Sequence, residues 1–378
     1  MNYELNESQK NLKKQMSEFC KAEIAPNASI LDDNRSEAAG LLKSNMEKLG
    51  SVGYLGLVCG LIKPQNGKDG ISQVIATEEL AGCCASTYAT AEVSAGLCGT
   101  AIDVFGTAAQ KEKYLGDLLS GKKIGSCKAI YTADDTSVIT ATKQGDGWVL
   151  NGTATMMGNG PISDLVIILA QTGEDAGQQT AFIVEKNASG IAVGEPAAEL
   201  GVKSFQVSSL TFDSCSLSAE NLLGSEGKGA EILSLLKEQQ DWGNTLALSG
   251  IGLASMREGV NYYKDGRKKL LTQVKSFKFA DLWTITDVGR LLIYQAVWAK
   301  ESGLRDASVL ASCAGAFVQD AASRVAMAVL EMMGSDGYKS GCAAERFYRD
   351  VKFFGFAGKS AEKHRDDIAK DVLDQIAG

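Results

Sequence analysis

The sequence changes its hydrophobic periodicity twice. Up to about residue 118, apolar side chains recur at helical spacing, as at Leu5, Leu12 and Met16. From about 120 to 226, short alternating and β-branched runs replace that pattern, as in 165–170 (LVIILA), and long helical patterns then return. The chain is therefore predicted to be mainly α with a central β domain. The predicted parts are a helical domain at 1–118, a β domain at 119–226 and a helical bundle at 227–378.

The composition is typical of a soluble globular protein. Hydrophobic residues make up 45% of the chain, charged residues 22%, and the formal net charge is -8. No basic face indicates nucleic-acid binding. We expect no membrane span, because no apolar run approaches the roughly 18 residues that a bilayer requires. The amino terminus also lacks the apolar segment of a secretory signal, so a cytoplasmic location is predicted.

The nine cysteines are scattered and form no CxxC pair, and the chain has a single histidine, His364. This pattern favours reduced, mostly buried thiols and predicts no metal site. His364 stands between Lys363 and Arg365 in a charged stretch, which predicts a solvated surface residue.

Eight short segments extend along nearly the whole chain. These segments are 48–57 (KLGSVGYLGL), 78–81 (EELA), 106–119 (GTAAQKEKYLGDLL) with 121–125, 145–152 (GDGWVLNG), 212–213 with 221–229, 280–282 with 294–298, 334–338, and 346–350 (RFYRD). Their order and spacing resemble those of one enzyme family, the acyl-CoA dehydrogenases.

The resemblance implies both a fold and a chemistry. The fold would be a helical domain, a small β-barrel or β-sandwich domain and a C-terminal four-helix bundle. FAD would lie between the β domain and the bundle, with a tetramer completing each site. In the family, the flavin takes a hydride from the β carbon of an acyl-CoA thioester while a carboxylate removes an α proton. Electron-transfer flavoprotein would be a partner only if this chain is redox-active.

The position that resembles the family's catalytic glutamate is occupied by Ala357, in the segment 356–359 (FAGK). Alanine cannot accept a proton, so the usual base is expected to be missing from this loop. Some relatives supply the base from an earlier helix, but the matching stretch 238–244 (EQQDWGN) contains no Glu-Arg pair in either register. Asp241 is the nearest carboxylate and a candidate substitute. The simpler interpretation is a solvated acid near a helix start, stabilised by the helix dipole.

The segments that resemble flavin contacts also depart from the family pattern. The segment 130–137 (IYTADDTS) lacks the proline and glycine of the family's turn, and its two aspartates would add negative charge near an anionic cofactor. The family's WITN becomes 156–159 (MMGN), in which only the asparagine is kept. Met156 could still support FAD, because methionine fills irregular apolar space beside aromatic rings. Gly158 is assigned to the same contact by family position.

The residues that resemble the family's pyrophosphate and adenosine contacts match only in part. Arg267 and Gln273 fall at such positions. In 331–338 (EMMGSDGY), Glu331 places a charge where the family has glutamine, and Gly334 is kept. Losing several of these hydrogen bonds would weaken flavin binding. We therefore expect FAD to bind weakly or to be shared with a partner subunit, and the isolated chain to be colourless or to lose flavin readily.

Four functions remain open on the sequence alone. The chain could be the degenerate subunit of a homo- or heterotetrameric acyl-CoA dehydrogenase, acting with a related partner that carries the base. It could be a flavin-dependent dehydrogenase with a relocated base, or a binding or scaffold protein without turnover. Finally, it could be a non-redox lyase, hydratase or isomerase on acyl-CoA, for which the acid-base candidates are Asp134, Asp135, Asp241, Glu331 and Tyr338.

Overall fold

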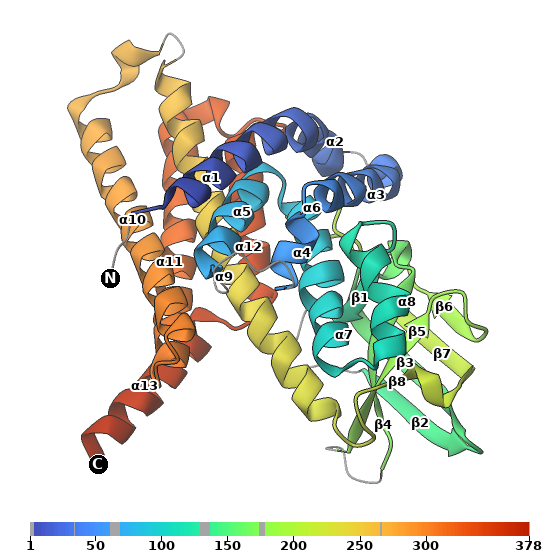
Figure 1. The fold of residues 1–378 in the computed structure, drawn as a ribbon. Helices are drawn as coiled ribbons and strands as arrows, with labels where there is room; N and C mark the ends of the chain where they lie inside the picture. The colour runs from blue at the N-terminus through green and yellow to red at the C-terminus, as the bar shows by residue number, and fades with distance from the viewer. Residues whose placement is uncertain are drawn as a thin grey trace.

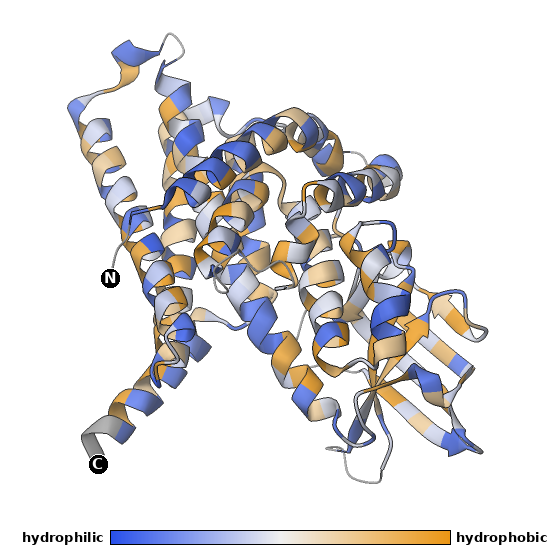
Figure 2. Ribbon diagram, in the orientation of Figure 1, coloured by the Kyte–Doolittle hydropathy of each residue, from blue (hydrophilic) through white to orange (hydrophobic). Residues whose placement is uncertain are grey.

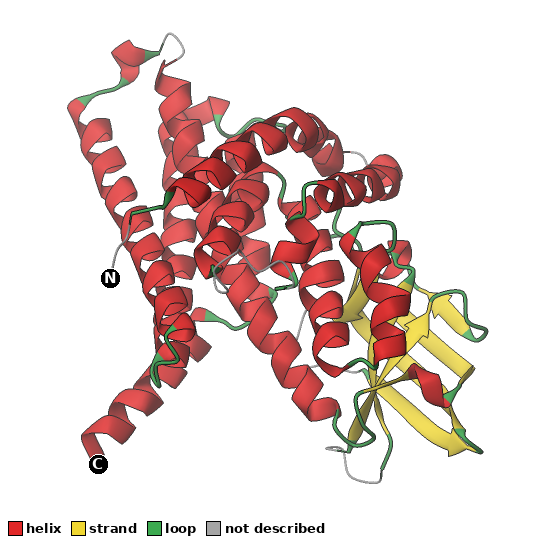
Figure 3. Cartoon of the chain, in the orientation of Figure 1, coloured by secondary structure: helices red, strands yellow, loops and turns green. Residues whose placement is uncertain are grey.

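The computed structural model describes residues 4–33, 35–60, 69–128, 137–173, 178–264 and 267–377. Figure 3 shows that the strands gather on one side of the molecule and that helices form the rest. Along the described chain, every strand lies between Gly125 and Leu223, with helices before and after. The predicted helical, β and helical order is confirmed, while the domain boundaries after residues 118 and 226 stay predictions.

The amino-terminal part is a layer of short helices in which sequence signals set the ends. At α8, Gln110 N donates to Thr107 Oγ1 at 3.2 Å and Thr107 N donates to Gln110 Oε1 at 2.9 Å, which forms a capping box. The helices are α1 (Glu7–Phe19), α2 (Ala25–Asp33), α3 (Arg35–Ser51), α4 (Tyr54–Val58), α5 (Gly70–Cys83), α6 (Ala85–Ala91), α7 (Thr100–Phe105) and α8 (Ala108–Leu119), with π-helical segments η1 (Cys20–Ile24) and η2 (Glu92–Gly99).

The central part is one eight-stranded sheet in the order β6-β7-β3-β1-β4-β5-β8, with β2 pairing with both β3 and β4. Its core includes Trp148 and Phe182, whose rings meet edge to face at 5.5 Å. β4 is apolar along nearly its whole length, as expected of a strand covered on both faces. The strands are β1 (Gly125–Lys128), β2 (Val138–Gln144), β3 (Gly147–Gly158), β4 (Leu165–Gln171), β5 (Gln179–Glu185), β6 (Ile191–Val193), β7 (Val207–Leu217) and β8 (Leu222–Leu223).

The carboxy-terminal part is a helical bundle whose first helix joins it to the sheet. Helix α9 extends for 36 residues, and Figure 1 shows it running from the sheet to the far end of the bundle. It packs closely on α5, because a Cβ at Gly250 would lie 2.5 Å from the Glu78 carbonyl oxygen. The bundle helices are α9 (Gly229–Lys264), α10 (Gln273–Glu301), α11 (Ala307–Met333), α12 (Ala343–Phe356) and α13 (Ala361–Ala377).

Hydrophobic residues are not confined to the interior of the bundle. Figure 2 shows hydrophobic and hydrophilic residues interspersed along α10. This helix leaves several large apolar side chains exposed in the single chain, namely Val274, Phe277, Trp283, Val288, Leu291 and Trp298.

The expectation of no membrane-length apolar run needs a correction. By length and composition alone, the helical stretch Ala307–Asp336 could cross a bilayer, although more than half of its most apolar window is buried inside the protein. Buried core helices of soluble proteins have the same composition, so this helix is weak evidence for a membrane span.

Most of the cysteines are buried, as the sequence predicted, and their reduced state stays a prediction. Within the described ranges, no group of three or more His, Cys, Asp or Glu side chains gathers where a metal could bind.

The prediction of a solvated His364 is wrong. Its side chain is 6% exposed, and a Cβ at Gly315 of α11 would lie 2.5 Å from its ring. Burial, with a smaller effect from the neighbouring Lys359, lowers the pKa of His364 to about 4. The charged flanking residues suggested a solvated face, but α13 packs against α11, which covers this position.

Candidate active site

The loop that follows α12 is buried against α9. Ala357 is the C-cap of α12 and is 2% exposed. Gln240 Nε2 on α9 donates to the Ala357 carbonyl oxygen at 3.0 Å, and Lys359 N donates to Asp241 Oδ1 at 2.7 Å. These bonds fix the backbone of the loop, so Ala357 keeps a defined place beside α9.

A small cavity lies between α6, η2, α9 and α12, with Ala357 on its wall. Its volume of about 20 Å³ is room for about one water molecule. Aromatic rings from three directions narrow it, and polar groups come from α6, η2 and α9. The lining residues are Tyr88, Ala89, Glu92, Val93, Leu97, Phe205, Gln240, Asn244, Phe353, Phe354 and Ala357. We refer to this space as the Ala357 cleft.

Glu92 places a carboxyl group in the Ala357 cleft. It is the first residue of the π-helical segment η2, a rare conformation that is frequent at functional sites. A Cβ at Gly96 would lie 2.8 Å from Glu92 Cδ, and a Cβ at Gly243 would lie 2.5 Å from Glu92 Oε1. The carboxyl group therefore fits only because glycine stands at both positions.

Burial governs the charge of Glu92. The side chain is 8% exposed, and among the described residues no lysine or arginine forms an ion pair with it. Burial raises the pKa of Glu92 to about 7, and the nearby hydroxyl of Tyr88 opposes part of that rise. At neutral pH the group is therefore divided between its acid and carboxylate forms.

Asn244 Nδ2, a buried donor in the wall of the cleft, lacks a hydrogen-bond partner within the described structure. The buried Tyr88 hydroxyl also has no partner in good geometry there, although it lies close enough to Glu92 to lower the pKa of that carboxyl group. Leaving such groups unpaired costs about 1–3 kcal/mol each, so unpaired groups in a native structure require an explanation. A polar ligand in the cleft would satisfy them.

Asp241 does not line the cleft. It lies in the middle of α9, twelve residues after the helix begins at Gly229, and its carboxylate accepts the Lys359 backbone N–H. Burial raises the pKa of Asp241, whereas that hydrogen bond and the Lys359 charge lower it. The interpretation as a solvated acid near a helix start is therefore wrong, because Asp241 anchors the loop that carries Ala357.

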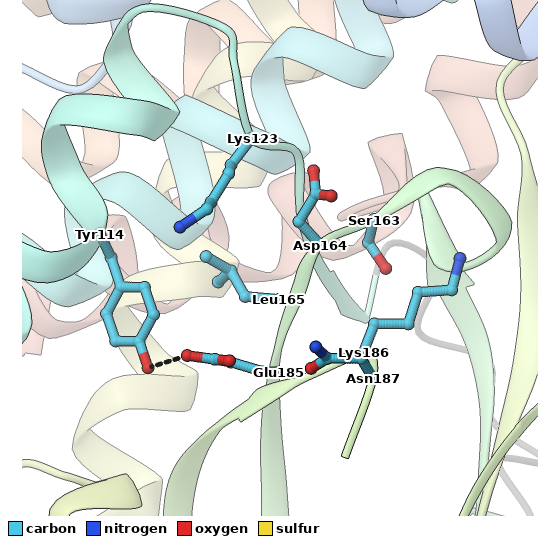
Figure 4. Close-up of a pocket in the computed structure, with 8 residues that line it drawn as sticks. All are labelled: Tyr114, Lys123, Ser163, Asp164, Leu165, Glu185, Lys186 and Asn187. Atoms are coloured by element: carbon cyan, nitrogen blue, oxygen red, sulfur yellow. Dashed lines mark hydrogen bonds between the residues drawn. The ribbon is translucent and has the colours of Figure 1, made fainter.

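A larger cavity lies elsewhere, between α8 and the ends of β4 and β5. Its volume is about 470 Å³ and it contains none of the residues predicted from sequence. Figure 4 shows Tyr114 pointing toward Glu185, whose carboxylate accepts a hydrogen bond from the Tyr114 hydroxyl at 3.2 Å. Lys113 Nζ lies 2.7 Å from the same carboxylate, and Asp164 Oδ2 accepts the backbone N–H of Ile124 at 2.8 Å. These contacts join α8 to the sheet, so we assign the site to the Ala357 cleft.

Comparison with known proteins identifies the family. Domain models described as the N-terminal, middle and C-terminal domains of acyl-CoA dehydrogenase match residues 6–122, 131–215 and 254–373. An acyl-CoA dehydrogenase of Bacillus subtilis is 30% identical over 379 residues, which cover 98% of this chain and 99% of the relative. The chain belongs to the acyl-CoA dehydrogenase family.

Other relatives agree along the whole length. A short-chain specific acyl-CoA dehydrogenase of Clostridium acetobutylicum is 29% identical over 93% of this chain and 94% of its own. The structure of butyryl-CoA dehydrogenase from Megasphaera elsdenii matches with a TM-score of 0.87 and 28% identity, covering 99% of this chain and all of that one. The glutaryl-CoA complex of a glutaryl-CoA dehydrogenase gives a TM-score of 0.88 at 25% identity, over 99% and 97% of the two chains. The predicted family and fold are confirmed.

Members of this family bind FAD, and the residues predicted to contact it in this chain form two groups. The first lies at the end of β3. Met156 has a positive φ of 57° beside a break in the register between β3 and β7, and Gly158 pairs with Val207 at the strand end. Such a bulge re-aims the side chains of a strand and is frequent beside active sites. The segment 129–136, with Asp134 and Asp135, lies outside the described residues.

The second group lies near the turn between α9 and α10 and at the end of α11. Arg267 stacks on the Tyr262 ring at 4.4 Å and lies 3.9 Å from Asp336. Glu331 pairs with Lys278 at 3.4 Å. The predicted cation and acid therefore already have partners of opposite charge.

The remaining predicted contacts of this group are exposed. Gln273 is the first residue of α10, and Gly334 caps α11 with a φ of 63°. Tyr338, an acid-base candidate on sequence, is 82% exposed and is not part of the lining of the Ala357 cleft.

The two groups lie apart within this chain. Asn159, next to Gly158, bonds to the Thr90 carbonyl oxygen beside the cleft. From Gly243 at the cleft, α9 runs for about 20 more residues, or roughly 30 Å, before the second group begins. The chemistry assigned to this single chain therefore involves only its own side chains.

Sequence reasoning missed Glu92, Tyr88 and Asn244. One signal was present, because Glu92 is an isolated acid in the otherwise small and apolar run 85–102 (ASTYATAEVSAGLCGTAI). A lone carboxyl group in a stretch destined for burial is a functional-site candidate.

Proposed function

We propose that the chain is a divergent acyl-CoA dehydrogenase-family subunit that binds an acyl-CoA thioester in the Ala357 cleft and lacks the family's base on the loop after α12. The observation that carries the proposal is the cleft itself. It lies where the resemblance places the base, and it contains the unpaired polar groups of Tyr88 and Asn244. A thioester carbonyl oxygen is an acceptor that such donors would bind.

We also propose that the acyl group is short. Phe205, Phe353 and Phe354 narrow the cleft to about 20 Å³, which leaves little space for a long chain. The relative from Clostridium acetobutylicum is described as short-chain specific. Interiors are close-packed, so a longer acyl chain would have to displace these rings.

Binding of butyryl-CoA and of free CoA to the purified protein tests the proposal. We expect butyryl-CoA to bind more tightly than CoA, because the cleft holds the acyl group. Ala357→Leu should fill the cleft and weaken butyryl-CoA binding at least about tenfold, with free CoA unaffected. Lys300→Gln, on the exposed surface of α10, is the matched control. Equal affinities for CoA and butyryl-CoA in the wild-type protein would contradict the proposal.

FAD is proposed to bind weakly to the isolated chain or to be shared between two chains. This is supported by the separation of the two contact groups and by the ion pairs that already occupy Arg267 and Glu331. An absorption spectrum after gel filtration tests it. Flavin bands below stoichiometric amounts are expected, and a full complement retained by a monomer would contradict it.

The subunit is further proposed to act in a homo- or heterotetramer with a related partner. The exposed apolar side chains of α10 support an interface there, because such surfaces favour association. Native mass spectrometry of the protein from its source should show a related chain in near-equal amount if the assembly is heteromeric. Electron-transfer flavoprotein is a partner only if that assembly is redox-active, and the cytoplasmic location stays a prediction.

A second candidate function is non-redox chemistry on an acyl-CoA, such as that of a lyase, hydratase or isomerase. The specific observation in its favour is Glu92, which supplies an acid-base group without any cofactor. Turnover of CoA esters without an electron acceptor would support it. A protein that binds no CoA ester at all would instead support the scaffold alternative.

A further inference from the structure

We propose that Glu92 is the acid-base group of the Ala357 cleft, taking a proton from the α carbon of an acyl-CoA thioester and returning it to the same carbon. The inference rests on the proposed function, because it requires a thioester in the cleft. In this proposal, a residue of η2 removes the α proton, which the resemblance assigns to the loop of Ala357 or to α9.

Steric fit is the first argument. Some relatives carry their catalytic glutamate on an earlier helix. The stretch 238–244 can be aligned with that helix in two registers, and in one of them Gly243 occupies the position of the glutamate. In this protein, the space over Gly243 holds the carboxyl group of Glu92, since a Cβ there would lie 2.5 Å from Oε1 and 2.8 Å from Cδ. Gly96 makes the matching space on the side of η2. A carboxyl group thus reaches the cleft from the opposite wall, beside Ala357.

Hydrogen-bond donors are the second argument. Removing the α proton breaks a C–H bond, forms an O–H bond on Glu92 and moves the electron pair onto the thioester carbonyl oxygen. That oxygen then requires donors. Asn244 Nδ2 is buried and unpaired within the described structure, and Tyr88 Oη, beside the Glu92 carboxyl group, belongs to the same wall. Returning the proton restores the thioester, so this exchange needs neither oxidant nor reductant.

The surroundings of Glu92 are the third argument. The titratable groups that face it are Tyr54 and Cys59 at α4 and Tyr88 on α6, and burial raises the pKa of all three above the neutral range. The wall formed by α9 and α12 contributes neutral side chains. Between pH 6 and 8, Glu92 is thus the group of the cleft that changes charge, and a base works best when its pKa lies near the working pH.

Deuterium incorporation tests the proposal. The full-length protein, as purified, is incubated with butyryl-CoA in D2O without an electron acceptor, and mass spectrometry follows deuterium at the α carbon. We expect exchange that rises with pH through an apparent pKa near 7. Glu92→Gln should slow it at least about 100-fold while butyryl-CoA binding is retained. Glu92→Asp should retain a slower, pH-dependent exchange. Glu238→Gln, an exposed acid on α9, should match the wild-type protein.

Other outcomes separate the two proposals. A wild-type protein that binds no butyryl-CoA would overturn both. Binding without exchange, or exchange that Glu92→Gln and Glu92→Asp leave unchanged in rate and pH profile, would overturn the role of Glu92 and leave the proposed binding function standing.

Discussion

The buried acids Glu78 and Glu79 on α5 form ion pairs with arginine, whereas the buried acid Glu92 on η2 does not. The carboxylate of Glu78 on α5 accepts a hydrogen bond from Arg290 Nε at 3.1 Å. The carboxylate of Glu79 accepts two hydrogen bonds from Arg257, at 2.9 and 3.2 Å. These pairs join α5 to α10 and α9. Glu92 has comparable burial, but none of the described cations pairs with it. Carboxyl groups of similar burial therefore occur in this fold both with and without a countercharge.

The difference indicates which acids serve the structure and which serves chemistry. A buried carboxylate paired with arginine stays charged and orients the helices that it joins. A buried acid without a cation has a raised pKa, and such groups are concentrated at functional sites. The comparison predicts opposite responses to the same substitution at the two places.

Glu78→Gln should have the largest effect on stability. It leaves the guanidinium of Arg290 buried without its countercharge, and breaking such a pair costs about 3–5 kcal/mol. Chemical denaturation at pH 7 measures the loss. In the double variant Glu78→Gln with Arg290→Met, much of the stability should return, and a double variant as unstable as the single one would contradict the pairing.

Glu92→Gln should stabilise the folded protein at pH 8, which is opposite to the effect of Glu78→Gln. The folded pKa of about 7 lies above the ordinary 4.5 of the unfolded chain, so the folded state binds the proton more tightly. The contribution of Glu92 to wild-type stability is therefore greatest below pH 4.5, falls as the pH rises through 7 and is lower by about 3 kcal/mol above it, at about 1.4 kcal/mol per pH unit. The glutamine variant should lose this pH dependence and be the more stable protein at pH 8. Equal stability of the two proteins at pH 8 would show that Glu92 is not desolvated.

Gly243→Ala should destabilise by about 1–2 kcal/mol, because the added methyl group would press on Glu92 Oε1 and Tyr88 Oη. In a Glu92→Ala background the penalty should shrink to the part caused by Tyr88 Oη, and a double-mutant cycle measures the difference as coupling. Gly116→Ala on α8 is the control, since no atom lies within 4 Å of its Cβ position. It should stabilise by about 0.5–1 kcal/mol through helix propensity.

Glu238→Gln should have the smallest effect. Its ion pair with Lys300 is exposed, with the two side chains 67% and 65% accessible, and such pairs contribute about 0.2–1 kcal/mol at most. Thermal denaturation at low and high salt should show little change. A loss comparable to that of Glu78→Gln would mean that burial does not set the difference between the two kinds of acid.

The architecture could be predicted from sequence because it depends on periodicity and on segments that keep their order. The strand pattern of 165–170 and the helix pattern of 106–119 both form as expected. Local signals also misled. Asp241 was predicted to lie near a helix start, whereas α9 begins at Gly229 and continues to Lys264.

From the sequence, the candidate site could be predicted only through the absence of the usual catalytic carboxylate. Ala357 identifies the place, but the carboxyl group that faces it comes from η2, and its fit depends on glycines at 96 and 243. No local pattern states that these positions meet, since the contact arises from the packing of α6 and η2 against α9. His364 shows the same limit, because α11 covers a face that its charged neighbours suggested was solvated.

A crystal structure of the protein with a thioether analogue of butyryl-CoA would test the central claim most directly. A Glu92 carboxyl oxygen should lie within about 3–3.5 Å of the carbon that corresponds to the α carbon, with the analogue seated beside Ala357. An analogue bound in the cleft with Glu92 turned away from that carbon, and another carboxylate at the same distance, would contradict the account.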